Sequence, residues 1–278
     1  MIKPFLQDQA FLDDVAAADG GAEGFHLWWL GQSGYLLKYG ERHLLLDPYL
    51  SDSLTRKYAA TDKPHVRMTE RVVAPERLAF VDVVTSSHNH TDHLDAETLL
   101  PLLQSKIIIP EANRAFVAER LGIARSLPLG LTDGETVSAG GFSFTGVPAA
   151  HNDLETDSDG RHRFMGYLIR FGPWTVYHSG DTLWYDGLVD RLKPTHIDVA
   201  LLPINGNDPA RRVAGNLDGR EAVALARAVG ARLVIPCHYD LFTFNTVSPR
   251  LFEEEAKQVG QPYRILQAGE RWSSAEPA

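Results

Sequence analysis

Apolar and polar positions divide the 278-residue chain into two similar stretches. Apolar residues at helical spacing in 5–18 predict a first helix. The next apolar runs alternate around short glycine-containing turns, a pattern typical of an antiparallel meander. The predicted strands of this first stretch are 25–30, 35–39, 43–46, 81–85 and 106–109. Two further helices are predicted at 95–104 and 111–121.

The second stretch repeats this order. Its predicted strands are 135–137, 142–147, 165–171, 175–177, 197–202, 233–236 and 264–267. Its predicted helices are 183–192, 219–229 and 249–259. Two sheets packed face to face with helices outside account for this order, which predicts an α/β, four-layer αββα sandwich. Because no linker rich in Pro, Gly or Ser separates them, we expect one domain over 1–278, with halves of about 1–150 and 151–278.

Residues 50–79 interrupt the first stretch with a polar, irregular sequence. One or two short helices fit within it. A long insertion of this kind is typically a lid or a binding loop, or else it is disordered.

Composition limits the classes of function. Apolar residues make up 44% of the chain, and its net charge of −9 argues against stable binding to a nucleic-acid backbone. The single cysteine, Cys237, excludes an internal disulfide and fits a reducing compartment. The first residues are acidic and contain no long apolar run, so neither a signal peptide nor a membrane span is predicted. We therefore expect a cytoplasmic protein without membrane attachment.

The sequence from Thr85 to Asp95 carries the strongest chemical signal. Between a predicted strand and a predicted helix, it spaces three histidines and an aspartate as H-x-H-x-D-H, namely His88, His90, Asp92 and His93. Imidazole nitrogens and carboxylate oxygens are the ligands that borderline divalent metals prefer. This pattern predicts a metal site.

Three later residues complete a ligand set. His151, Asp181 and His238 each lie one to five residues beyond a predicted strand, and strand ends meet at one edge of a sandwich. We assign His88, His90 and His151 to one ion. We assign Asp92, His93 and His238 to a second ion, and Asp181 would be shared by both. Two ions roughly 3.5–4 Å apart can activate a water and polarise a substrate oxygen. Zinc or manganese suits these ligands best, with iron or nickel as alternatives.

Other polar residues near strand ends are candidates with open alternatives. Asp47 is either a carboxylate that orients a ligand histidine or a turn former. His178 and Cys237 are expected to be structural. Substrate contacts, or alternatively solvated loop positions, are His65, Arg67, Asn205, Asn207, Arg211 and Arg212. The remaining histidines, without supporting context, are expected at the surface or in the core: His26, His43, His162 and His196.

These motifs resemble the metallo-β-lactamase fold superfamily, whose signature is H-x-H-x-D-H. The segments 28–34, 47–48, 87–95, 177–181, 197–200 and 234–240 are similar to its branch of L-ascorbate-6-phosphate lactonases and their uncharacterised relatives. The segment 146–164 departs from that lactonase. The resemblance implies a metal-dependent lactonase or esterase acting on a small, polar sugar-acid lactone, with or without a phosphate group. A metal-bridging hydroxide would attack, Asp92 would orient it and shuttle a proton, and homo-oligomers would form.

Alternatives remain at this point. The same two ions would serve a phosphodiesterase or ribonuclease, although the acidic chain counts against RNA. Hydrolysis of β-lactam antibiotics is disfavoured without a secretion signal. In a different class, a metal-binding sensor or scaffold would retain the ligands without turnover. A flavo-di-iron redox protein would need a further carboxylate in the histidine block and a flavin domain, and neither is visible.

Overall fold

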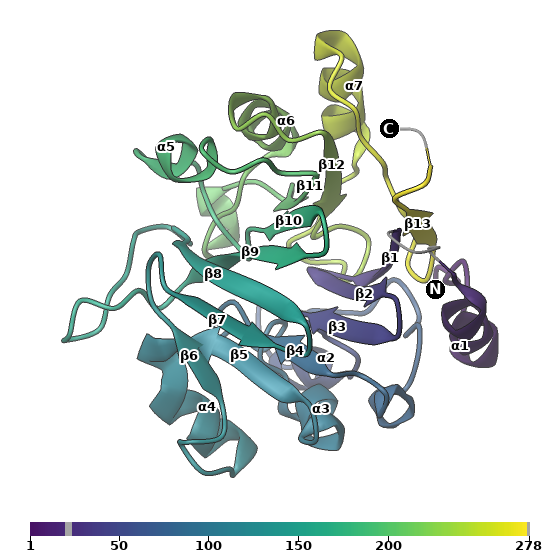
Figure 1. The fold of residues 1–278 in the computed structure, drawn as a ribbon, viewed down its shortest axis with the longest axis vertical. Coiled ribbons are helices and arrows are strands. Elements are labelled where there is room, and N and C mark those ends of the chain that lie inside the picture. Colours follow the sequence, from purple (N-terminus) through teal and green to yellow (C-terminus); the bar gives the residue numbers. More distant parts are fainter. Residues whose placement is uncertain (20–23, 277–278) are drawn as a thin grey trace.

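Two mixed β-sheets pack face to face in the computed structural model, which describes residues 1–19 and 24–276. Figure 1 shows α5, α6 and α7 outside one sheet and α1, α3 and α4 outside the other. The predicted four-layer αββα sandwich is therefore confirmed.

The first sheet has the strand order β13-β1-β2-β3-β4-β5-β6. Its strands are β1 (Phe25–Gly31), β2 (Gly34–Tyr39), β3 (Arg42–Leu46), β4 (Val83–Thr85), β5 (Lys106–Pro110), β6 (Leu129–Leu131) and β13 (Arg271–Ser273). The meander β1-β2-β3 is antiparallel, whereas β3, β4, β5 and β6 run parallel.

The second sheet has the order β12-β11-β10-β9-β8-β7. Its strands are β7 (Thr136–Ala139), β8 (Phe142–Pro148), β9 (Met165–Phe171), β10 (Trp174–His178), β11 (Val199–Pro203) and β12 (Leu233–Cys237). The strands β7 to β10 form an antiparallel meander, and β10, β11 and β12 are parallel. The chain changes from the first sheet to the second between β6 and β7, and β13 returns to the first.

Helices cover the outer faces of both sheets. They are α1 (Asp8–Ala17), α3 (Ala96–Leu99), α4 (Arg114–Leu121), α5 (Leu188–Leu192), α6 (Gly219–Ala228) and α7 (Arg250–Val259), whereas α2 (Ser53–Tyr58) belongs to the insertion 50–79. Single 3₁₀ turns are η1 (Pro75–Leu78), η2 (Leu100–Leu102), η3 (Glu111–Asn113) and η4 (Pro209–Arg211). None of the helices in the described ranges is long and apolar enough to cross a bilayer.

All seven residues of β1 are buried, which explains its continuous apolar run. Its outer face lies under α1, where Phe11 meets Trp28 edge-to-face at 6.4 Å between ring centroids. The Trp28 indole N–H donates to Asp14 Oδ2 at 2.8 Å, so the one polar atom of that ring is satisfied. The amphipathic first helix thus seals the sheet.

The last predicted strand, 264–267, is wrong. Only Tyr263 forms an isolated bridge, to Val234, and Pro262 beside it has no N–H to extend a ladder. The sheet strand at this end is β13, which pairs Trp272 with Leu27 of β1. Its three residues carry no recognisable pattern, so the partner strand decides its conformation.

Two predicted helices are shorter than expected. The segment 95–104 forms α3, capped by the Asp95 carboxylate, and then tightens into η2 around Pro101. The segment 183–192 is irregular until Gly187, and only α5 is helical.

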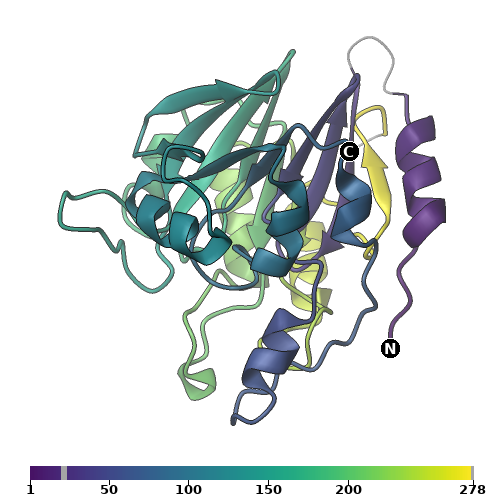
Figure 2. The ribbon, with the colours of Figure 1, turned by 90° about the horizontal axis from the view of Figure 1, so that it is seen from below.

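The insertion 50–79 is ordered in the structure and contains α2 and η1. Backbone hydrogen bonds join it to the loop after β12, from Met68 N to Leu241 O (2.7 Å) and from Thr243 N to Val66 O (2.8 Å). A small separate core, made of Tyr49, Leu54, Leu241 and Phe242, lies between the two segments. In Figure 2, α2 and the loop that carries η4 extend from the same side of the molecule.

Candidate metal centre

The predicted ligands follow strands that end at one edge of the sandwich. In the first sheet β3 and β4 are parallel, so Asp47 and the histidine block that begins at His88 leave the sheet together. In the second sheet β8, β10 and β12 share one direction, because β9 is antiparallel to β8 and β10. The segments carrying His151, Asp181 and His238 therefore start at the same edge. Packing of the two sheets brings both sets together.

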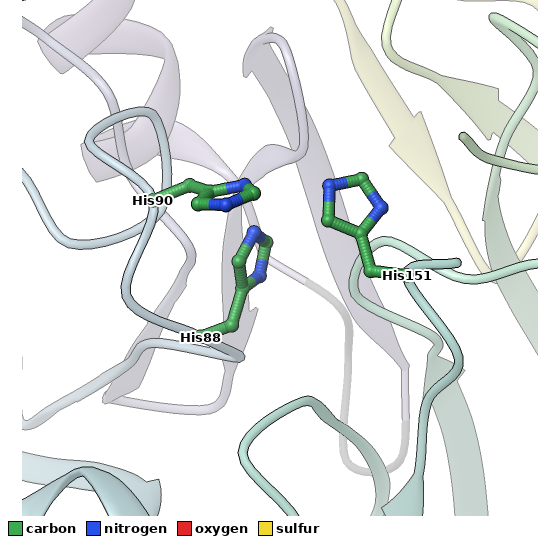
Figure 3. Close-up of side chains that lie close together, drawn as sticks. All are labelled: His88, His90 and His151. Carbon is green, nitrogen blue, oxygen red and sulfur yellow. The ribbon is translucent and has the colours of Figure 1, made fainter. Parts of the chain in front are cut away.

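The first group consists of His88, His90 and His151, whose ligand atoms all lie within 4.8 Å of one another. Figure 3 shows the imidazole of His151 facing those of His88 and His90 from the opposite side. The ring centroids are 4.6 to 5.2 Å apart. His88 and His151 are buried, and His90 is exposed toward the surface.

The second group consists of Asp92, His93, Asp181 and His238, again with ligand atoms within 4.8 Å. Asp181 Oδ2 lies 3.3 Å from His93 Nε2 and 3.4 Å from His238 Nε2. The same oxygen is 3.7 Å from His151 Nε2 of the first group. Asp181 therefore lies between the groups, as a carboxylate shared by two ions would.

Asp47 is fully buried and lies against His93, with Oδ2 2.7 Å from Nδ1. Its Oδ1 accepts hydrogen bonds from Ser87 N and Thr85 Oγ1, both at 3.0 Å. The contact fixes the ring of His93 and directs Nε2 toward Asp181. This is the arrangement predicted for a carboxylate that orients a ligand histidine.

Other ligands are held by uncharged groups. His151 Nδ1 is 2.8 Å from the Gly215 carbonyl oxygen, which can only accept, so Nδ1 carries the proton and Nε2 keeps its lone pair. His88 Nδ1 is 3.0 Å from Ser87 Oγ. The Gln32 side-chain amide contacts Asp92 and His238. His88 and His151 are therefore each held through Nδ1 and keep Nε2 for the site.

The electrostatics of the first group leave it ready for a cation, whereas in the second group a cation would displace a proton, because Asp181, Asp92 and Asp47 outweigh burial and raise the pKa of His93 well above its ordinary value. Burial lowers the pKa of His88 well below its ordinary value, and burial together with the neighbouring His151 lowers that of His90 to about 4. The pKa of Asp181 is well below its usual range because His93 and His238 outweigh the opposing effect of burial. Neutral imidazoles and an ionised carboxylate are the forms that bind metals.

The structure passes a simple test of whether these residues fit a metal. Nε2 of His88 is buried and has no hydrogen-bond partner among residues 1–19 and 24–276. An orphaned buried nitrogen costs free energy unless something binds it. Three imidazoles in one group, and two imidazoles with two carboxylates in the other, suit a borderline divalent ion.

Three residues of this edge have left-handed backbones, namely Asp47 (φ 37°), His238 (φ 68°) and Gln32 (φ 50°). Such conformations cost free energy for non-glycine residues and persist only where the surroundings fix them. His238 N donates to Gln32 O at 3.0 Å, which joins two of these positions. The strain is located where side chains must leave a strand toward the site.

A cavity of about 470 Å³ opens above both groups. Five of the seven ligands reach its surface, and the insertion 50–79 forms one wall with Lys57, Tyr58, Lys63 and His65. The opposite walls come from α4, from the loop after η4 and from Asn245. The insertion is thus a wall of the cavity over the candidate metals.

The predicted substrate residues are not all in this cavity. His65 lines it, with Nδ1 2.8 Å from the Lys63 carbonyl oxygen. Arg67 instead bonds Asp52 at 2.7 Å and lies over the Tyr49 ring.

The residues predicted on the loop 204–216 lie outside the cavity lining. Asn205 is buried behind it, and Arg211 donates to Asn245 Oδ1 and to the Asn205 carbonyl oxygen. Arg212 pairs with Asp62, and Asn207 is exposed. Contact between any of these four side chains and a substrate stays a prediction.

Five further residues line the cavity and are not among the predicted site residues, namely Lys57, Lys63, Phe116, Arg120 and Asn245. The concentration of basic residues in the insertion was a signal for the two lysines. No sequence pattern indicates the other three, because they come from distant segments. His178 and Cys237 are buried, as expected, and His178 Nε2 is 3.0 Å from the Ser33 carbonyl oxygen.

Comparison with known proteins agrees with this geometry. Residues 42–239 match the sequence family described as a beta-lactamase superfamily domain. A metal-dependent hydrolase of Opitutus terrae is 33% identical over 251 residues, which cover 88% of this chain and 97% of the relative. One from Rubrobacter xylanophilus is 28% identical over 264 residues, covering 90% and 97%.

Solved structures share the fold at low identity. The isothiocyanate hydrolase from Delia radicum gut bacteria superposes with a TM-score of 0.72 at 20% identity, covering 89% of this chain and 98% of that one. The metallo-beta-lactamase fold protein YhfI of Bacillus subtilis gives 0.65 at 20% identity, covering 91% and 100%. With its fold, its paired ligand groups and these relatives, the chain belongs to the metallo-β-lactamase superfamily, in the family of metal-dependent hydrolases that the Opitutus terrae protein represents.

Proposed function

We propose that this protein is a metal-dependent hydrolase that opens a lactone or ester in a small, polar, anionic sugar acid. The observation that carries the proposal is the pair of ligand groups joined by Asp181 at the floor of one cavity. Two divalent ions bound there would supply an activated water and polarise the carbonyl of the substrate. Zinc or manganese suits the donor set, and iron or nickel is an alternative.

The residues of the chain supply the remaining requirements. Asp92 lies on the cavity surface beside His238, and this position supports a role for its carboxylate in orienting the attacking water and passing a proton to the departing oxygen. His65 is held by the Lys63 carbonyl through Nδ1, which leaves Nε2 as an acceptor for a substrate hydroxyl. These groups favour a polar substrate.

Charge on the cavity walls favours an anion. Lys57, Lys63 and Arg120 line the cavity, and none of them forms an ion pair with a carboxylate in the described ranges. Lys57 Nζ instead reaches Thr91 Oγ1 at 3.3 Å, next to Asp92. The only acidic lining residues, Asp92 and Asp181, belong to the candidate metal group. A carboxylate or phosphate would neutralise this excess.

A substrate panel tests the proposal. Metal-free protein is loaded separately with zinc, manganese, iron(II) or nickel, the bound metal is measured by elemental analysis, and each form is assayed on sugar-acid lactones, phosphodiesters and phosphomonoesters. We expect turnover of a phosphorylated or carboxylated lactone that disappears on chelation. Because the same cations suit phosphate, turnover of a phosphodiester without any lactone would favour a phosphodiesterase. No turnover by any loaded form would favour a sensor or scaffold.

The cationic wall gives a separate prediction. Lys57→Met and Lys63→Met should each raise KM for an anionic lactone by about tenfold with little change in kcat. A charged hydrogen bond contributes about 1.5–3 kcal/mol, and because both lysines are solvent-accessible we expect an effect at the low end of that range. Lys106→Met, which removes an exposed lysine at the start of β5, is the matched control. An unchanged KM in both variants would contradict an anion site on this wall.

A further inference from the structure

We infer that Gln32 is a positioning residue that sets the affinity of the second group for its metal ion. The inference rests on the two-ion site of the proposed function. Gln32 lies in the turn between β1 and β2, is 5% exposed and does not line the cavity. It therefore sits behind the ligands, on the side away from substrate.

The Gln32 side chain reaches two ligands from opposite halves of the chain. Its Nε2 donates to Asp92 Oδ2 at 2.8 Å and lies 3.0 Å from His238 Nε2. Within the described ranges, this is the one hydrogen bond that the Asp92 carboxylate receives. The Gln32 carbonyl oxygen accepts from His238 N and from the Trp29 indole N–H, both at 3.0 Å. The Gln32 main chain and side chain thus both contact His238, and the side chain also holds Asp92.

An uncharged donor suits this position. A side-chain amide carries two N–H groups, so it can hold the Asp92 carboxylate while the nitrogen of His238 is given to a metal. The carboxylate keeps further lone pairs for the ion and keeps its full negative charge. A lysine or arginine at the same place would compete electrostatically with the cation.

The first group has no contact with Gln32. His88 is held by the Ser87 hydroxyl, and His151 by the Gly215 carbonyl. Loss of the amide should therefore affect one ion and spare the other, whereas general damage to the fold would weaken both.

The test is a titration of metal-free protein with cobalt(II). Binding is measured by calorimetry and by the visible absorption of the bound ion. Wild type, Gln32→Met and Gln32→Asn are compared. Methionine keeps the length of the side chain but has no N–H donors. Asparagine keeps an amide, which its shorter side chain moves away from Asp92, and it tolerates the left-handed backbone. Gln261→Met is the matched control, because Gln261 is also buried and donates to two carbonyls, of Ala231 (3.1 Å) and Pro262 (3.2 Å), away from the site.

We expect wild type and Gln261→Met to bind two ions. Both Gln32 variants should bind the first ion normally and the second roughly 10- to 100-fold more weakly, the usual cost of losing a group that orients a ligand. Two unchanged ions in a folded Gln32 variant, or equal weakening of both, would overturn the inference. A wild type that takes up only one ion would overturn it too, and would show in the same experiment that the two-ion proposal itself had failed.

Discussion

Asp181→Asn should abolish stable metal binding by both groups and with it all hydrolytic turnover. Asp181 Oδ2 lies within 3.7 Å of imidazole nitrogens from His93, His151 and His238, so among residues 1–19 and 24–276 it is the carboxylate that joins the two groups. Asparagine preserves the shape but removes the negative charge. Because loss of a mere orienting group already costs roughly 10- to 100-fold in affinity, we expect a larger loss here. Elemental analysis after dialysis and calorimetric titration measure it.

Asp198→Asn provides the matched control for this experiment. Asp198 is also a buried carboxylate near a strand end, but it accepts from Thr175 N (2.8 Å) and Arg232 (3.0 Å) on another part of the sheet. This variant should lose stability and keep its metal. Full metal content in Asp181→Asn would show that the ligand assignment is wrong.

Asp47→Asn is expected to have the second largest effect. An amide offers one acceptor where the carboxylate accepts from His93, Ser87 and Thr85, so at least one buried donor loses its partner. We expect affinity for the ion bound by His93 to fall roughly 10- to 100-fold. The unsatisfied donor should lower the free energy of unfolding by about 1–3 kcal/mol. Asparagine tolerates the left-handed backbone, so strain does not confuse the result.

Metal titration and urea unfolding of the metal-free protein separate these two effects. Asp95→Asn is the comparison, because Asp95 is also buried, at the end of the histidine block, but caps α3 through Thr98 N (3.1 Å) and contacts none of the seven candidate ligands. It should lose stability alone. If Asp47→Asn also lost stability alone, Asp47 would be structural only.

Much of this fold follows from local pattern. Buried strands such as β1 and β2 are read from continuous apolar runs, and their order with the helices predicts the sandwich. The pattern fails where a partner decides the conformation. β13 is a strand because Leu27 and Trp28 present an open edge to Trp272 and Arg271, and no residue within 271–273 signals it.

The candidate ligands were predictable because they lie close together in the sequence or directly after predicted strands. His88 to His93 lie on one turn after one strand, and each later ligand follows a strand closely. The cavity wall was not predictable, because Lys57, Phe116 and Asn245 meet only through the packing of distant loops. Arg67, a predicted substrate contact, lies outside the cavity lining and bonds Asp52 within the insertion.

The sequence by itself determined most of the order of strands and helices and the donor atoms of the site, which suit a divalent ion and hydrolysis. The chemistry of a histidine or a carboxylate does not depend on where it lies, so a motif can report it. Only the tertiary structure decided that Asp181 stands between the two groups, that Asp47 holds His93 and that Gln32 stands behind Asp92. Those are distances between residues far apart in the chain, and they exist only when the two sheets pack.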